Sequence, residues 1–125
     1  MIKTFKFVYK TDLEHYYVDL KVDLSKFTKE VAQEFNSFWV HAEERIKESN
    51  NDVLLAALRL YASKCLELAS YNRLIDGRDM ENIFSKGRGS FELEGFPSPS
   101  ELGIEVTRVD NIMIWMDEME LVQDD

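Results

Sequence analysis

The stretch VLLAALRLYASKCLELASYNRL (residues 53–74) decides the fold, because it is the most apolar segment of the chain and has helical spacing. Its apolar side chains cover most of the helix circumference, and only one stripe stays polar: Arg59, Ser63, Glu67 and Ser70. A helix that is apolar nearly all round is normally buried between layers or pressed against a partner. We therefore expect residues 53–74 to form the central helix of the fold.

A second long helix is predicted directly before it, over residues 28–49. The apolar residues recur there at the i, i+3, i+4, i+7 spacing of an amphipathic helix, at Val31, Phe35, Phe38, Trp39, Ala42 and Ile46. Thr28 or Ser25 can cap its start, and Glu30 in the first turn suits the helix dipole. The polar turn 49–52 then separates the two helices.

The first 23 residues alternate with a period of two, which predicts two half-buried strands joined by a short turn. The apolar parity consists of Phe5, Phe7, Tyr9, Tyr16, Val18, Leu20 and Val22. A hairpin is not stable alone in water, so its apolar face needs a cover, which the two helices provide.

The last third predicts shorter elements: a helical piece at 80–84, a helical turn at 98–103 and a strand at 104–109. After a tight turn at Asp110 and Asn111, residues 112–122 read as a second extended segment with apolar side chains on both faces. We predict one α+β domain over residues 1–125, in which an antiparallel sheet (N-terminal hairpin plus C-terminal strands) is covered on one face by two long helices. The strand order stays open, and the basic first strand could lie near the acidic last segment.

The charge is unevenly distributed along the chain, which has 24 acidic and 15 basic residues and a net charge of -9. Residues 1–90 carry as many bases as acids, whereas residues 91–125 carry ten acids and a single base, Arg108. Within the first 29 residues the sign is reversed, with six Lys against four acids. A pI near 4.7 argues against direct nucleic-acid binding, which relies on clustered Lys and Arg.

The acidic segment 91–125 is the candidate partner-binding surface. Aromatic and Met side chains rimmed by charge are typical interface anchors, and arrayed acids can imitate phosphate spacing or dock in a basic groove of another protein. The predicted binding residues are Glu92, Glu94, Glu101, Glu105, Asp110, Trp115, Asp117, Glu118 and Glu120. The alternative is that the segment only keeps the protein in solution through its charge.

Sequence motifs for catalysis are scarce. Gly87-Arg88-Gly89 lacks the spacing and the following helix of a phosphate-binding loop. The two histidines, His15 and His41, fall in different elements without a second histidine at i+4, which disfavours a zinc site. We therefore predict no catalytic residue, no metal and no cofactor. Asp117, Glu118 and Glu120 leave a metal-dependent enzyme as a third reading of the function.

The compartment is predicted to be cytoplasmic. Cys65 is the only cysteine, so no disulfide can form within the chain, and we expect it to be a buried helix residue. The longest apolar run, Val53–Leu58, has six residues, far fewer than the roughly 20 that span a bilayer. The start of the chain also lacks the apolar stretch of a secretory signal.

The order of elements resembles a small uncharacterised bacterial family that is often found on phages and prophages. The resemblance covers residues 1–75 and consists of the hairpin, a helix with Phe38-Trp39 and Glu44-Arg45, and an alanine-rich helix that begins near Asp52-Val53. It implies a mobile-element setting, in which small acidic proteins often inhibit host machinery by stoichiometric binding, including nucleic-acid-guided defence complexes. It carries over no catalytic residue.

These observations favour a non-enzymatic protein-binding module: a phage or mobile-element inhibitor whose acidic surface docks on the basic surface of a host protein or nucleoprotein complex. The alternative is a homo-oligomeric accessory protein, in which apolar residues 53–69 or 112–121 seal a homodimer. Neither reading requires a membrane or direct contact with nucleic acid.

Overall fold

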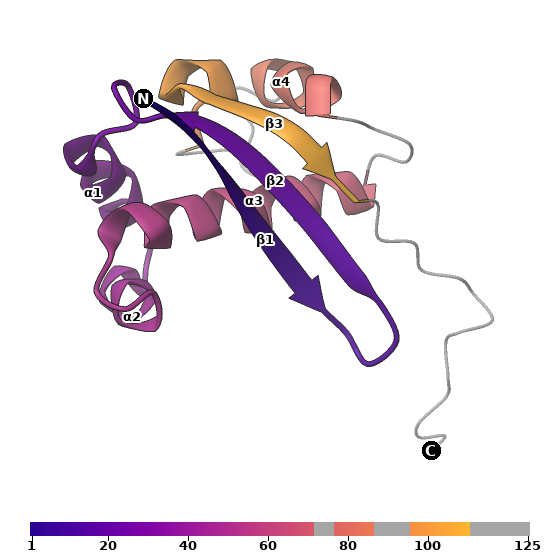
Figure 1. Ribbon diagram of the computed structural model, residues 1–125, viewed down its shortest axis with the longest axis horizontal. Coiled ribbons are helices and arrows are strands. Elements are labelled where there is room, and N and C mark those ends of the chain that lie inside the picture. The colour runs from indigo at the N-terminus through magenta and orange to yellow at the C-terminus, as the bar shows by residue number, and fades with distance from the viewer. Residues whose placement is uncertain (72–76, 87–95, 111–125) are drawn as a thin grey trace.

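The computed structural model describes residues 1–71, 77–86 and 96–110, and these form a three-stranded antiparallel sheet with helices on one face (Figure 1). The predicted α+β class is confirmed. In chain order the elements are β1 (Ile2–Lys10), β2 (His15–Asp23), α1 (Lys29–Ser37), α2 (Ala42–Glu48), α3 (Val53–Tyr71), α4 (Gly77–Lys86), the 3-10 helix η2 (Pro99–Leu102) and β3 (Ile104–Val109).

The hairpin forms as the alternation predicts. β1 and β2 pair along their whole length, from Ile2 opposite Asp23 to Lys10 opposite His15. At the turn, the backbone N–H of Thr11 donates to the carbonyl of Glu14 at 2.8 Å, and the hydroxyl of Thr11 accepts the N–H of Glu14 at 3.0 Å. The predicted inward parity of β2 is confirmed, since its buried residues are Val18, Leu20 and Val22.

The sheet order is β1-β2-β3, so β1 and β3 lie at opposite edges with β2 between them. Strand β3 pairs with β2 from Val22 opposite Ile104 to Val18 opposite Val109, with a bulge at Asp19/Leu20. The basic first strand therefore neighbours β2 and not the C-terminal strand β3. The predicted second C-terminal strand, 112–122, lies outside the described residues.

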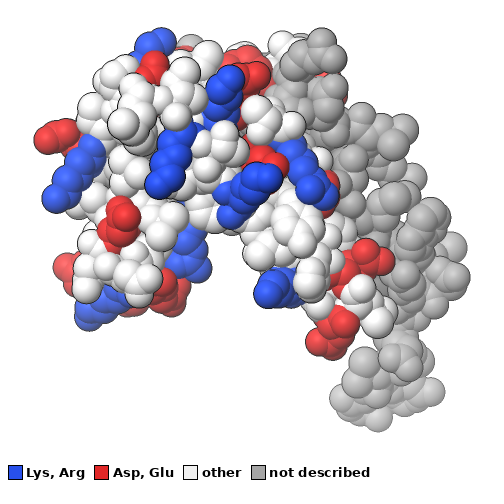
Figure 2. Space-filling model, viewed as in Figure 1, with Lys and Arg blue, Asp and Glu red and all other residues white. Residues whose placement is uncertain are grey.

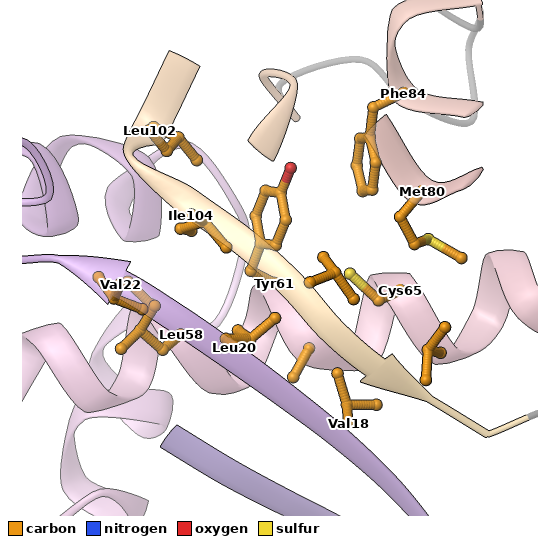
Figure 3. Close-up of a cluster of buried hydrophobic side chains, with 14 of the residues drawn as sticks. Val18, Leu20, Val22, Leu58, Tyr61, Cys65, Met80, Phe84, Leu102 and Ile104 are labelled. Atoms are coloured by element: carbon orange, nitrogen blue, oxygen red, sulfur yellow. The ribbon is translucent and has the colours of Figure 1, made fainter. Parts of the chain in front are cut away.

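Helix α3 lies under the sheet and is the centre of the core, as its composition predicts (Figure 3). Leu58, Tyr61 and Cys65 are completely buried in it, and Met80 and Phe84 reach the same core from α4. The Tyr61 ring stacks on Phe84 with centroids 5.0 Å apart, and its hydroxyl donates to the carbonyl of Pro97 at 2.7 Å. The prediction that Cys65 is a buried helix residue is confirmed.

The predicted helix 28–49 is wrong, because the chain breaks between α1 and α2. His41 has a left-handed backbone, with φ of 65°, and this geometry cannot continue a helix. Among the helices that the structure describes, α3 alone is long, while α1 packs beside it and α2 turns away at the corner (Figure 1).

Arg45 stabilises this break by taking up backbone groups that a continuous helix would have paired. Its guanidinium donates to the carbonyls of Asn36 at 2.8 Å and Trp39 at 3.2 Å, and to the side-chain oxygen of Asn36 at 2.8 Å. Asn36, which is fully buried, donates in turn to the carbonyl of Ala42 at 3.1 Å. Arg45 of the Phe-Trp…Glu-Arg pattern therefore stabilises a helix corner that the apolar spacing alone did not indicate.

The helical turn before β3 matches its sequence signals. Ser98 precedes Pro99 at the start of η2, and Gly103 ends it with φ of 74°. A Cβ on Gly103 would lie 2.7 Å from the Cβ of Lys26, so the close approach of β3 to the end of β2 requires glycine here.

Candidate functional site: the groove between β1 and α3

The predicted acidic surface is not assembled by the described residues. Only Glu101, Glu105 and Asp110 fall among them; Glu92, Glu94, Trp115, Asp117, Glu118 and Glu120 lie outside. Glu101 is exposed on η2, and Glu105 is exposed on β3 opposite Lys21.

Asp110 has a structural position at the end of β3. Its carboxylate accepts the backbone N–H of Tyr17 at 2.7 Å and the Arg108 guanidinium at 3.1 Å. The Arg108 guanidinium also lies over the Tyr17 ring, 4.6 Å from its centroid. The hydrogen bond that Arg108 donates to the Asp110 carboxylate raises the pKa of the guanidinium. The carboxylate of Asp110 thus closes the β2–β3 ladder, and its prediction as a partner contact gains no support from this geometry.

The sheet face away from the helices is basic along β1, whereas β2 and β3 carry charges of both signs there. Strand β1 contributes Lys6 and Lys10 to this face and contains no acid, while Lys3 lies on the opposite face, with its ammonium 5.1 Å from the centroid of the Phe5 ring. Across the sheet, Asp19 lies between Lys6 on β1 and Arg108 on β3. Figure 2 shows the Lys and Arg side chains as a band across this face.

A groove of about 600 Å³ lies between the hairpin and α3. Figure 2 shows the molecule hollowed here, between the lobe formed by α2 and the far end of the hairpin. Its apolar wall is made by Phe7, Val8, Tyr9, Tyr16, Val18, Ala62 and Leu66, and its polar residues are Thr11, Arg59, Ser63, Glu67 and Ser70. The polar stripe that interrupts α3 in the sequence therefore forms one side of this groove.

Small side chains on α3 keep the groove open. The hydroxyl of Ser63 donates to the carbonyl of Leu60 at 2.7 Å and that of Ser70 to the carbonyl of Glu67, so both serines fold back on their own helix. Arg59 is held away at one end, where it donates to the hydroxyl of Ser49 at 2.9 Å. The middle of the groove is therefore lined by short side chains and aromatic rings.

The groove runs beside a free strand edge. Among the described residues, β1 pairs with β2 alone, so the other edge of this nine-residue strand presents backbone N–H and C=O groups without a ladder partner. Large apolar side chains are exposed along it, with Val8 at 43% and Tyr9 at 55% of their surface. A free strand edge next to a groove that accepts side chains is the arrangement by which proteins bind extended peptide segments.

Groups suited to catalysis are scarce among the described residues. Within residues 1–71, 77–86 and 96–110, no group of three or more His, Cys, Asp or Glu side chains is placed to hold a metal ion. Burial raises the pKa of Tyr61 and of the Cys65 thiol, but both lie in the core and neither lines the groove. Burial in apolar surroundings makes a thiol less reactive, so it does not activate Cys65 as a nucleophile.

No helix in the described part of the chain combines the length and the apolar character that crossing a bilayer requires. The cytoplasmic location stays a prediction.

The groove was not predicted from sequence, although each of its two walls forms a pattern in the chain. The polar stripe of α3 was recognised but given no role, and Phe7 and Tyr9 were assigned to the buried parity of the hairpin. A stripe of Ser and Ala on an otherwise large-residue helix, facing aromatic strand residues, is the signal that would have indicated a depression.

Comparison with known proteins places the chain in a family without an assigned activity. The model of the family described as protein of unknown function (DUF2528) matches residues 17–121. The chain therefore belongs to this family. No curated protein and no solved structure matches it. The match covers the α1–α2 corner and α3, on which the resemblance to an uncharacterised family rests, and it extends well past residue 75.

Proposed function

We propose that this DUF2528 family member is a non-enzymatic protein-binding module that takes an extended segment of a partner protein into the β1–α3 groove. The observation that carries the proposal is the free nine-residue edge of β1 beside an apolar groove. A bound segment would add a fourth strand to the sheet, and its backbone would pair with β1.

Specificity in such a complex comes from the side chains of the added strand. Successive side chains of a strand point to opposite faces, so every second one would enter the groove. There it would contact Phe7, Tyr9 and Leu66 on the apolar wall. The residues between would face the basic side of the sheet near Lys6 and Lys10, which favours acidic partners.

The surface differs from the acidic one predicted from sequence, but the class of function is the same. A stoichiometric inhibitor encoded by a phage or another mobile element stays our proposal for the biological role. The acidic segment 91–125 as the surface that meets a basic host protein is likewise a proposal. A charge reversal of Asp117, Glu118 and Glu120 to Lys that leaves partner capture unchanged would remove the acidic surface from consideration.

The test of the groove uses a photo-crosslinking amino acid in place of Tyr9, in the full chain expressed in its native cell. We expect it to trap a protein that mass spectrometry identifies, and we expect Ser63→Trp to abolish the adduct by filling the groove. Gln33→Trp is the matched control, because Gln33 is exposed on α1 outside the groove. An adduct that persists in the Ser63→Trp chain contradicts the proposal.

The second candidate, a homodimer, follows from the same free edge, since two β1 strands could pair directly. Each β1 carries three Lys and no acid, so the two strands would repel one another at low salt. Light scattering across a concentration series tests it: a monomer throughout excludes the dimer.

A further inference from the structure

The free edge of β1 has a fixed hydrogen-bonding register, which follows from the pairing of β2 with its two neighbours. In an antiparallel sheet, successive residues of a strand direct their backbone N–H and C=O groups to opposite sides. The N–H of Asp23 donates to the carbonyl of Gly103 at 2.8 Å, and the carbonyl of Tyr17 accepts the N–H of Asp110 at 3.0 Å. The odd-numbered residues of β2 therefore pair with β3, and its even-numbered residues pair with β1.

This alternation decides which backbone groups of β1 are open at the edge. Tyr16 lies opposite Tyr9, so the odd-numbered residues of β1 direct their backbone groups to β2. The bond from the N–H of Leu24 to the carbonyl of Met1, at 2.8 Å, agrees with this register at the other end of the hairpin. Among the described residues, backbone groups face the free edge of β1 (Figure 1) at Lys6, Val8 and Lys10.

The side chains of β1 alternate between two different surfaces. Phe7 and Tyr9 line the groove, whereas Lys6 and Lys10 lie on the opposite face of the sheet. Side chains of directly opposite residues in paired strands lie on the same face, with Cβ atoms about 4.5–5.5 Å apart. An added strand would therefore place one side chain beside each lysine and two side chains in the groove, separated by the residue opposite Val8.

The middle of the groove suits small apolar side chains. Aromatic rings form its wall on the hairpin, and Ala62 and Ser63 contribute short side chains from α3. The hydroxyl of Ser63 donates to the carbonyl of Leu60 at 2.7 Å, so its proton is already used. A charged side chain placed there would lose water without gaining a partner, which disfavours acids at the groove positions.

The two lysines on the other face are available to acids. Among the described residues, no ion pair includes Lys6 or Lys10. Lys6 lies opposite Asp19, but Asp19 also lies opposite Arg108 on β3, and Lys10 lies opposite His15. An acid on the added strand beside each lysine would gain a cross-strand pair of opposite charges, which stabilises strand pairing.

We propose that the β1–α3 groove selects partner segments of the form acid–apolar–any–apolar–acid, with the acids beside Lys6 and Lys10 and the apolar side chains beside Phe7 and Tyr9. This inference rests on the proposed function, because it specifies the segment that the groove takes. The pattern is symmetric, so it holds for parallel and antiparallel pairing. Lys6 and Lys10 determine specificity, and the alternation of the segment matters as much as its composition.

The test titrates the isotope-labelled full chain with three synthetic peptides and follows the amide shifts by NMR. Thr-Glu-Val-Thr-Val-Glu-Thr has the proposed pattern. Thr-Val-Glu-Thr-Glu-Val-Thr has the same composition with acids at the groove positions, and Thr-Lys-Val-Thr-Val-Lys-Thr reverses the charge. We expect the first peptide to bind about tenfold more tightly than either of the others.

Amide hydrogen exchange measures the register of the bound peptide. In the free chain, the amides of Lys6, Val8 and Lys10 should exchange rapidly, whereas those of Phe7 and Tyr9 should be protected by pairing with β2. The first peptide should protect the three even-numbered amides and leave the other two unchanged. A peptide lying flat on the open face of the sheet would not produce this alternation.

Charge variants test the role of the lysines. Lys6→Glu with Lys10→Glu should reverse the preference, so that the lysine peptide binds more tightly than the glutamate peptide. Lys29→Glu with Lys47→Glu makes the same change at exposed positions of α1 and α2 and should leave the preference as it was. Lys10→Glu alone keeps Lys6 opposite Asp19 and should lower the preference for the glutamate peptide about threefold.

Three outcomes would overturn the proposal: equal binding of the first two peptides, no binding of any peptide, or protection of the Lys6, Val8 and Lys10 amides before peptide is added. If the pattern fails while the crosslinker at position 9 still traps a partner in a Ser63-dependent manner, the proposed function stands and the groove takes a segment of another sequence. If the crosslinker also traps nothing, the proposed function fails as well.

Discussion

The two sides of α3 differ in how completely they are covered. Toward β2, β3 and α4, Leu58, Tyr61 and Cys65 are fully buried. Toward the hairpin end, Arg59, Ser63, Glu67 and Ser70 border an open groove. One helix thus holds the fold together on one side and presents a binding surface on the other, so substitutions on the two sides should have separable effects.

Leu58→Ala should have the largest effect on stability. Leu58 is fully buried beside the sheet, and removing its side chain leaves a cavity, which typically lowers the free energy of unfolding by about 3 kcal/mol. Urea unfolding monitored by circular dichroism measures the loss. Leu13→Ala is the control, because Leu13 is 92% exposed and its removal should change stability by less than about 0.5 kcal/mol.

Arg45→Ala should come next, since it removes the donor that satisfies the helix corner. The side-chain oxygen of the fully buried Asn36 and the carbonyl of Trp39 lose this donor, and a buried acceptor without a partner costs about 1–3 kcal/mol. The free energy of unfolding should fall by about 2 kcal/mol, as measured by urea unfolding. An equal loss in Lys47→Ala, an exposed position on the same helix, would refute the role given to Arg45.

Tyr61→Phe should lower the free energy of unfolding by about 1 kcal/mol, because the carbonyl of Pro97 loses its donor while the ring stays in place. Thermal unfolding compared with Tyr9→Phe, whose ring is 55% exposed, measures the difference. A Tyr61→Phe variant as stable as the parent would show that the hydrogen bond of this hydroxyl does not contribute to the free energy of unfolding.

Ser63→Trp should have the smallest effect on stability among these variants, so it separates the groove side of α3 from the buried side. Ser63 is exposed on the groove side of α3, so we expect a stability change within about 0.5 kcal/mol. The same substitution should abolish the partner adduct of the crosslinker at position 9, because the indole ring fills the groove. If instead stability falls as far as in Leu58→Ala, the two sides of α3 are not separable.

Elements with a clear hydrophobic periodicity were predictable from sequence, whereas the contacts between elements were not. The hairpin parity, the apolar α3 and the Ser98–Gly103 turn were correct because each is set by neighbouring residues. The break after α1 was missed because it depends on Arg45 reaching back nine residues to Asn36, against an apolar spacing that fits one helix.

The candidate site was harder to predict, because it forms between segments about 50 residues apart in the chain. Phe7 and Ser63 line one groove only after α3 has packed under the sheet. Among the nine residues predicted to bind a partner, Asp110 accepts the backbone N–H of Tyr17 at the end of the β2–β3 ladder, a contact that no local pattern indicates. Sequence patterns showed that α3 has a polar stripe, but not what it faces.

The three lysines of β1 have a further consequence for how the protein behaves when concentrated. A long free strand edge with exposed Ile2, Val8 and Tyr9 is a template for sheet growth from one molecule to the next. Lys3, Lys6 and Lys10 place like charges on both partners of any such pairing between identical copies, while they leave the edge open to acidic segments. The lysines of β1 therefore oppose edge-to-edge pairing between identical copies. This electrostatic repulsion should weaken as the salt concentration rises.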